Sequence, residues 1–171
     1  MGENEKEIIK MVGLGVLVLS SFVLPGLPIA LKPFIKKQGK KRFQRTLKNL
    51  DEKGVIYLHG DRIKLSKKGQ KLLKEIQIKE IEISLPAKWD SIWRLVSYDI
   101  PDSFKKERDW FGWTLKRLGF KRIQESLWAY PYECKEEIAV IAQNLRISPF
   151  VIIMATNHLP QEQKLIKLFN I

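Results

Sequence analysis

The chain has 171 residues, 44% of them hydrophobic and 29% charged, a globular mixture that excludes a fibrous fold and wholesale disorder. Against 31 Lys and Arg stand 19 Asp and Glu, and the net charge of +12 predicts attraction to polyanions such as nucleic acid or an acidic membrane surface. One cysteine and two histidines exclude an internal disulfide and are too few for a four-ligand Cys/His zinc site within one chain.

The first long feature is an uncharged stretch from Met11 to Leu31. Proline and glycine at positions 25, 26 and 28 interrupt it, so its continuous part, Met11 to Leu24, is shorter than the roughly 20 residues of a membrane span. The preceding MGENEKEIIK is not basic enough for a signal peptide. We therefore expect a buried helix, no stable membrane insertion and a cytoplasmic protein. The alternative is a membrane-tethered interaction protein with cytoplasmic lysines at 32, 36, 37, 40 and 41.

Residues 32 to 79 hold 16 Lys and Arg against four acidic residues, which equals the excess charge of the whole chain. Within this block, Phe43, Leu47 and Leu50 recur at helical spacing and predict a helix from about Lys41 to Glu52 with these three side chains in a core. The opposite face then carries Lys41, Gln44, Arg45 and Lys48. Such a block is either a nucleic-acid-binding face or simply a solvated surface.

A hairpin and a second helix follow. Gly54 ends the basic helix, strands are expected at 55–58 and 62–65 around a tight turn at 59–61, and Ser66 is a suitable N-cap for a helix from Lys67 to Glu75, with Leu72 and Leu73 facing inward. The stretch RTLKNLDEKGVIYLHGDRIKLSKKGQKLL resembles winged-helix transcription regulators. That resemblance implies a helix in the major groove and a wing on the phosphate backbone. A winged helix that binds only protein is the alternative.

The candidate contacts with double-stranded DNA are the polar residues of the basic helix and wing. Lys and Arg neutralise phosphates, whereas Gln44, Arg45 and Asn49 have side chains able to address base edges. The full predicted set is Lys40, Lys41, Arg42, Gln44, Arg45, Lys48, Asn49, His59, Arg62 and Lys64.

The hydrophobic pattern in the second half of the chain predicts alternating strands and helices. EIQIKEIEISLPAKWD is interpreted as a strand-like linker, with the boundary near Leu85, giving domains 1–85 and 86–171. Strands are expected at 93–99, within 121–130 and at 150–155, with helices at 104–118 and 135–145 and a closing helix at 162–169. Asp102 or Ser103 would cap the first of these helices. The order βαββαβ is typical of a ferredoxin-like sheet, with helices on one face and the other face free for a partner.

WDSIWRLVSYDIPDSFKKERD and LKRLGFKRIQESLWAYP resemble the central domain of the phenylacetate-catabolism repressors of PaaX type, itself similar to the small CRISPR-associated adaptation endonuclease. The likeness covers roughly Trp89 to Thr156. It implies a homodimeric DNA-binding regulator in the first case and a metal-dependent nuclease in an integrase complex in the second. The repressors usually carry a further C-terminal domain not found in this sequence, so we do not expect a coenzyme A thioester as effector.

Asp99 is the one candidate catalytic and metal-binding residue. The endonuclease resemblance implies a position near a dimer axis, where two such carboxylates could hold one Mg²⁺. The simpler role is to accept hydrogen bonds from the following turn. His59 and His158 are expected to be turn residues, and Trp110, Trp113 and Trp128 are expected to pack in the core rather than stack on bases.

The sequence thus predicts an α+β protein with an N-terminal winged helix-turn-helix and a ferredoxin-like βαββαβ domain. Its expected function is that of a homodimeric transcriptional regulator, a repressor, that binds specific DNA sequences without a cofactor. The alternative is a Mg²⁺-dependent adaptation endonuclease with an added winged helix and an integrase partner.

Overall fold

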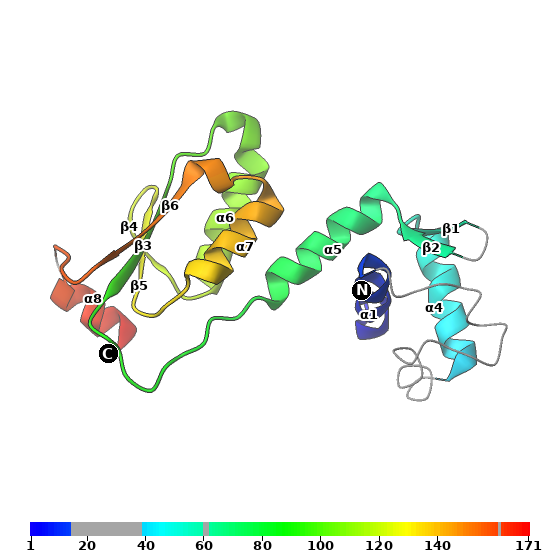
Figure 1. Ribbon diagram of the computed structural model, residues 1–171, viewed down its shortest axis with the longest axis horizontal. Coiled ribbons are helices and arrows are strands. Elements are labelled where there is room, and N and C mark those ends of the chain that lie inside the picture. The colour runs from blue at the N-terminus through cyan, green and yellow to red at the C-terminus, as the bar shows by residue number, and fades with distance from the viewer. Residues whose placement is uncertain (15–38, 60–61, 161) are drawn as a thin grey trace. The chain divides into compact units, whose positions relative to one another are not determined.

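The computed structural model describes residues 1–14, 39–59, 62–160 and 162–171 (Figure 1). It divides into two compact units, Met1–Gln77 and Ile78–Ile171. Apart from its first residues, the predicted buried helix at Met11–Leu31 lies outside the described residues. None of the described helices combines the length and the apolar character needed to cross a membrane.

The described residues of the first unit form two helices, a hairpin and most of a further helix. In chain order its elements are α1 (Glu3–Gly13), α4 (Lys40–Glu52), β1 (Ile56–His59), β2 (Arg62–Leu65) and α5 (Lys67–Glu80). Phe43, Leu47 and Leu50 are buried, as predicted, and they share a core with Ile8 and Ile9 of α1. The apolar face of α4 is thereby covered, and its polar face turns away from this core.

The junction between hairpin and α5 depends on two small residues. Ser66 caps α5 as predicted, because its Oγ accepts a hydrogen bond from the backbone N–H of Gly69 at 3.0 Å. A Cβ at position 69 would lie 2.1 Å from the carbonyl oxygen of Val55, so only glycine fits. Gly54 has a φ of +63°, which lets the chain leave α4 directly into β1.

The predicted strand-like linker from Glu75 is wrong at its start, because α5 continues to Glu80. Ile76 packs in the core of the first unit, whereas Ile78 packs in that of the second, together with the partly buried Ile81 and Ile83. The alternating isoleucines resemble the pattern of a strand because residues of one helix contribute side chains to two different cores. Arg117 donates to the carbonyl oxygens of Ile78 and Ile81, which satisfies the C-terminal end of α5.

The second unit is an α+β structure around a four-stranded antiparallel sheet. Its main elements are β3 (Trp93–Tyr98), α6 (Lys105–Arg117), β4 (Lys121–Gln124), β5 (Leu127–Tyr130), α7 (Lys135–Leu145), β6 (Val151–Thr156) and α8 (Glu162–Phe169). The spatial order of the strands is β4-β5-β3-β6. Single 3₁₀ turns at Asp102–Phe104 and Ser148–Phe150 precede α6 and β6.

The predicted capping of the helix after β3 is wrong. Neither Asp102 nor Ser103 caps α6, because the 3₁₀ turn places both residues ahead of Phe104, the N-cap residue, which makes no side-chain capping bond. Asp102 instead forms an ion pair with Arg108, one turn into α6, with 3.0 Å between Oδ1 and Nη2.

The two faces of the sheet are covered differently (Figure 1). Val96 of β3 faces α6 and α7 and packs with Phe111 and Ile138. Trp93 and Leu95 face the other way and pack with Leu165 of α8. The face expected to be free is therefore partly covered by α8, which the βαββαβ pattern does not include.

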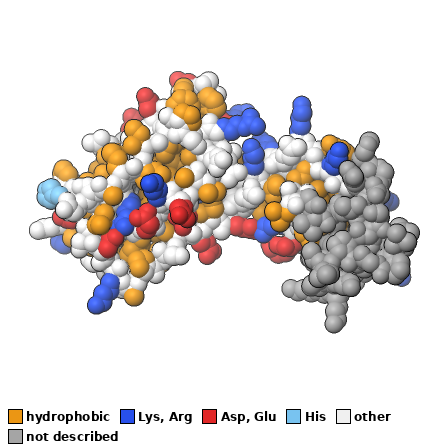
Figure 2. All heavy atoms as spheres, viewed as in Figure 1, with side chains coloured by type: hydrophobic (Ala, Val, Ile, Leu, Met, Phe, Trp, Pro, Cys, Tyr) orange, Lys and Arg blue, Asp and Glu red, His pale blue; other side chains and the backbone are white. Residues whose placement is uncertain are grey.

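What remains open on that face lies along β6. Ile152 is paired with Ser97 and Met154 with Leu95, so both side chains share the face of Leu95. They are 59% and 43% exposed, respectively. Figure 2 shows hydrophobic side chains interspersed with charged ones on the surface of this unit.

Candidate nucleic-acid interface

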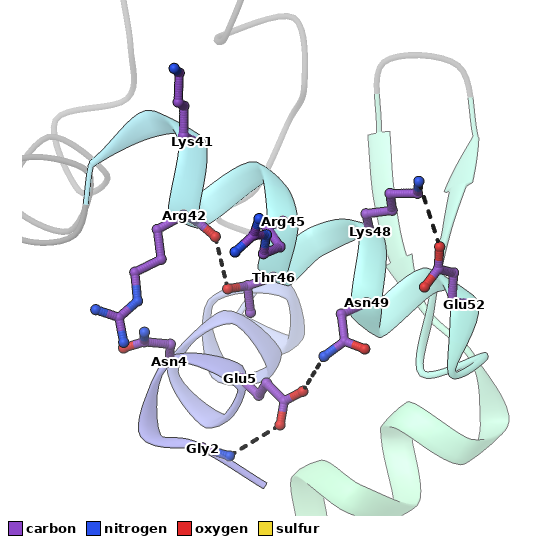
Figure 3. Close-up of a pocket in the computed structure, with 10 residues that line it drawn as sticks. All are labelled: Gly2, Asn4, Glu5, Lys41, Arg42, Arg45, Thr46, Lys48, Asn49 and Glu52. Carbon is purple, nitrogen blue, oxygen red and sulfur yellow. Dashed lines mark hydrogen bonds and ion pairs between the residues drawn. The ribbon is translucent and has the colours of Figure 1, made fainter.

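The basic face of α4 borders a cavity of about 1000 Å³ (Figure 3). Its walls come from α4 and from the N-terminal end of α1. The lining residues are Gly2, Asn4, Glu5, Lys41, Arg42, Arg45, Thr46, Lys48, Asn49 and Glu52. Arg42, Arg45 and Asn49 follow each other at helical spacing and form one stripe along this wall.

Most cations on this face lack acidic partners. Within the described part of the chain, Lys41, Arg42 and Arg45 form no ion pair, and all three are exposed. Lys48 lies 3.8 Å from Glu52, but both side chains are largely in water, where such a pair contributes little. The positive charge of α4 is therefore available to an anionic partner.

The other predicted DNA contacts are only partly described. Gln44 is exposed on α4, and Lys64 is exposed on β2, opposite Tyr57 in the hairpin. Lys40 begins α4, and His59 and Arg62 are paired at the end of the hairpin, but their side chains lie outside the described residues.

Glu5 belongs to this site, although it was not among the predicted residues. Its Oε1 accepts a hydrogen bond from Asn49 Nδ2 at 3.0 Å, and its Oε2 accepts one from the backbone N–H of Gly2 at 3.1 Å (Figure 3). Oε1 also accepts a hydrogen bond from Lys53 Nζ at 2.7 Å. The Lys53 hydrogen bond is the main cause that lowers the pKa of the Glu5 carboxyl. In the sequence, a Glu three residues after Gly2 indicates a helix start. No neighbouring residue indicates that the Glu5 side chain also contacts α4.

Asp99 lies in a second cavity of about 700 Å³, in the second unit. The cavity is lined by Tyr98, Asp99, Ile100, Arg108, Asp109, Gly112, Trp113, Lys116, Arg122, Glu125, Ser126 and Trp128. Asp99 is exposed, and its backbone N–H donates to the carbonyl oxygen of Phe150 at 3.0 Å. Among the described residues no three His, Cys, Asp or Glu side chains are grouped so that they could hold a metal ion.

The tryptophans and the second histidine have mainly structural positions. Trp128 is buried and Trp110 packs against the same core, as predicted. The prediction is wrong for Trp113, which is 50% exposed and has the Arg117 guanidinium 5.9 Å from its ring centroid. His158 follows β6 in a turn, where its carbonyl oxygen accepts a hydrogen bond from the Thr156 hydroxyl.

Residues 86–166 match the family model of the PaaX protein central Cas2-like domain. This part of the chain is similar to the PaaX-type central domains. The match includes all of β3 to β6 and most of α8, and it confirms the resemblance inferred from the sequence. No curated protein matches the chain.

The second unit contains a nearly buried arginine. Arg94 is 8% exposed, and its guanidinium donates to both carboxylate oxygens of Asp90 at 2.7 Å and to Glu133 Oε2 at 3.1 Å. It also donates to the carbonyl oxygens of Ile92 and Pro131. The second oxygen of Glu133 accepts the backbone N–H of Lys135 at the start of α7. This cluster joins β3, the loop before it and the beginning of α7.

Proposed function

We propose that the protein is a transcriptional regulator, a repressor, that binds specific sequences in double-stranded DNA as a homodimer. In this proposal the first unit is a winged helix whose α4 enters the major groove while the β1–β2 hairpin contacts the phosphate backbone. The second unit is a ferredoxin-like domain, and the protein works in the cytoplasm without a cofactor.

The observation that carries this proposal is the basic face of α4, on which Lys41, Arg42 and Arg45 form no ion pair among the described residues, in a chain whose residues 86–166 match the PaaX central domain. Lys41, Arg42, Arg45 and Lys48 lie on one exposed surface, and their spacing suits contacts with about four phosphates per protomer. Exposed Ile152 and Met154 support a second copy as the partner of the remaining sheet face, because a symmetric dimer would cover them.

Binding of duplex DNA is expected to be strongly dependent on salt. For a dimer with about four phosphate contacts per protomer, log K should fall with log salt at a slope of roughly −7. Arg45→Ala with Lys48→Ala should reduce the slope to roughly −3.5 and weaken binding on the order of 100-fold at moderate salt. Fluorescence anisotropy of a labelled duplex, titrated at several salt concentrations, measures both quantities.

The matched control is Lys105→Ala with Lys106→Ala, which removes the same charge from exposed positions at the start of α6. This variant should keep both the affinity and the slope. Equal losses in the two double variants, or a wild type whose affinity ignores salt, would refute DNA binding by α4. Sedimentation of the same samples tests the dimer, and a monomer at micromolar concentration would remove that part of the proposal.

The endonuclease alternative is tested at Asp99. We expect wild-type protein with Mg²⁺ or Mn²⁺ to cleave no DNA or RNA above a metal-free control, because one exposed carboxylate binds and positions such a cation weakly. Asp99→Ala should leave DNA binding unchanged, since no side-chain bond is lost within the described structure. Cleavage by wild type that Asp99→Ala alone abolishes would replace the regulator by a nuclease.

A further inference from the structure

The Asn49 amide has a defined orientation. A carboxylate only accepts hydrogen bonds, so the group that Asn49 turns toward Glu5 must be the nitrogen Nδ2. The carbonyl oxygen Oδ1 then points away from Glu5 (Figure 3). Asn49 is exposed, so this oxygen can be reached from outside the protein.

Glu5 is itself firmly held. Its side chain is only 11% exposed, and Lys53 and the backbone of Gly2 bind the same carboxylate. Buried Ile8 and Ile9 fix α1, the helix that carries it, in the core shared with α4. The position of the carboxylate beside α4 thus does not depend on Asn49.

We propose that Glu5 of α1 is a specificity-determining positioning residue, which holds Asn49 of α4 so that Oδ1 faces the bases of bound DNA. This rests on the proposed function. A presented acceptor oxygen pairs with an exocyclic amino group in the major groove, which only adenine and cytosine carry there. Without Glu5, the Asn49 amide rotates freely and offers a donor as readily as an acceptor. The preference for one base over the others at that position of the DNA then becomes weaker.

The experiment is a selection of bound sequences from a randomised duplex pool. Asn49→Ala identifies the base pair that Asn49 reads, through a loss of preference of roughly 10-fold at that position. Glu5→Ala and Glu5→Met should each lose the same preference, while the salt slope and the affinity for unrelated DNA stay at wild-type values. Combining Glu5→Ala with Asn49→Ala should cause no further loss, because both act on one contact.

Two variants separate the hydrogen bond from charge and from folding. Glu5→Gln loses the charge, but its Oε1 can still accept from Asn49, so it should keep the preference. Glu7→Ala removes an exposed acid of the same helix that pairs only with Lys10 among the described residues, and it should behave as wild type. Thermal unfolding of every variant shows whether α1 and α4 remain folded. If Glu5→Ala unfolds, Glu5→Met replaces it in the test, because methionine has a similar length to glutamate and a good helix propensity.

The inference fails if Glu5→Met keeps the preference that Asn49→Ala loses, if Glu5→Gln loses it, or if Asn49→Ala changes no base preference. Those outcomes leave salt-dependent DNA binding intact. Failure of the proposed function gives a different result, because the wild type would then show no salt-dependent binding from which to select.

Discussion

Arg94→Met is expected to lower the free energy of unfolding of the second unit by about 2–4 kcal/mol. Methionine fills a similar volume but leaves the carbonyl oxygens of Ile92 and Pro131 without their donor. Asp90 and Glu133 would lose their shared cation, although their side chains, 46% and 68% exposed, regain water and moderate the cost. All five tryptophans of the chain lie in the second unit, so denaturation followed by tryptophan fluorescence reports on this unit.

Arg122→Met is the matched control, because Arg122 is exposed on β4 and forms no ion pair among the described residues. Its effect should stay within about 0.5 kcal/mol. Equal stability of the two variants would show that the Arg94 cluster does not stabilise the unit.

The Arg94 cluster also predicts how the difference between wild type and variant changes with pH. The hydrogen bond from Arg94 is the main cause that lowers the pKa of Asp90, and the Lys135 backbone N–H is the main cause for Glu133, with Arg94 contributing. Groups with a lowered folded-state pKa stabilise the fold above their unfolded values, and this contribution is lost as the pH falls through the lowered values. The advantage of wild type over Arg94→Met should therefore shrink below about pH 4.

Trp93→Ala is expected to have a comparable or larger effect, about 3–5 kcal/mol, because it empties the centre of the cluster between sheet and α8. The indole is fully buried, lies 4.7 Å from Trp89 and 5.8 Å from Phe169 between ring centroids, and donates from Nε1 to Glu162 Oε1 at 2.8 Å. Without the indole, α8 loses part of its packing against the sheet and the hydrogen bond that joins Glu162 to β3. Hydrogen exchange should then show faster exchange in α8 than in α7.

Two further substitutions provide comparisons for the loss of stability in Trp93→Ala. Trp93→Phe keeps most of the packing and loses the N–H donor, so it should cost about 1–2 kcal/mol. Trp113→Ala removes a half-exposed indole from α6 and should cost about 1 kcal/mol or less. If α8 stays as protected in Trp93→Ala as in Trp113→Ala, the indole does not hold α8 to the sheet.

Local patterns in the sequence predict many elements of the fold. The helices at Lys135–Leu145 and Glu162–Phe169 have the predicted bounds, and the apolar stripe of the first, Ile138, Ile141 and Leu145, is buried as expected. The polar face of α4 is exposed as expected. These features depend on residues within a few turns of one another.

What sequence reasoning missed depends on residues far apart in the chain. Glu5 reaches Asn49 across 44 positions, and Trp93 reaches Glu162 across 69. Neither pair has a spacing that a helical or strand period would reveal. The extension of α5 was missed for the same reason, since the helical position of Ile78 is explained only by a core built from later residues.

The course of α5 decides where the protein can be divided for separate study. A fragment that begins at residue 86 starts where the match to the PaaX family model starts, yet it lacks Ile78, Ile81 and Ile83, which pack against the core of the second unit. It also removes the carbonyl groups that Arg117 binds. Such a fragment would expose apolar side chains of its own core and leave a guanidinium without acceptors. A fragment that begins before the last turn of α5 keeps these isoleucines and carbonyl groups. The second unit therefore begins earlier in the chain than the match to the family model does.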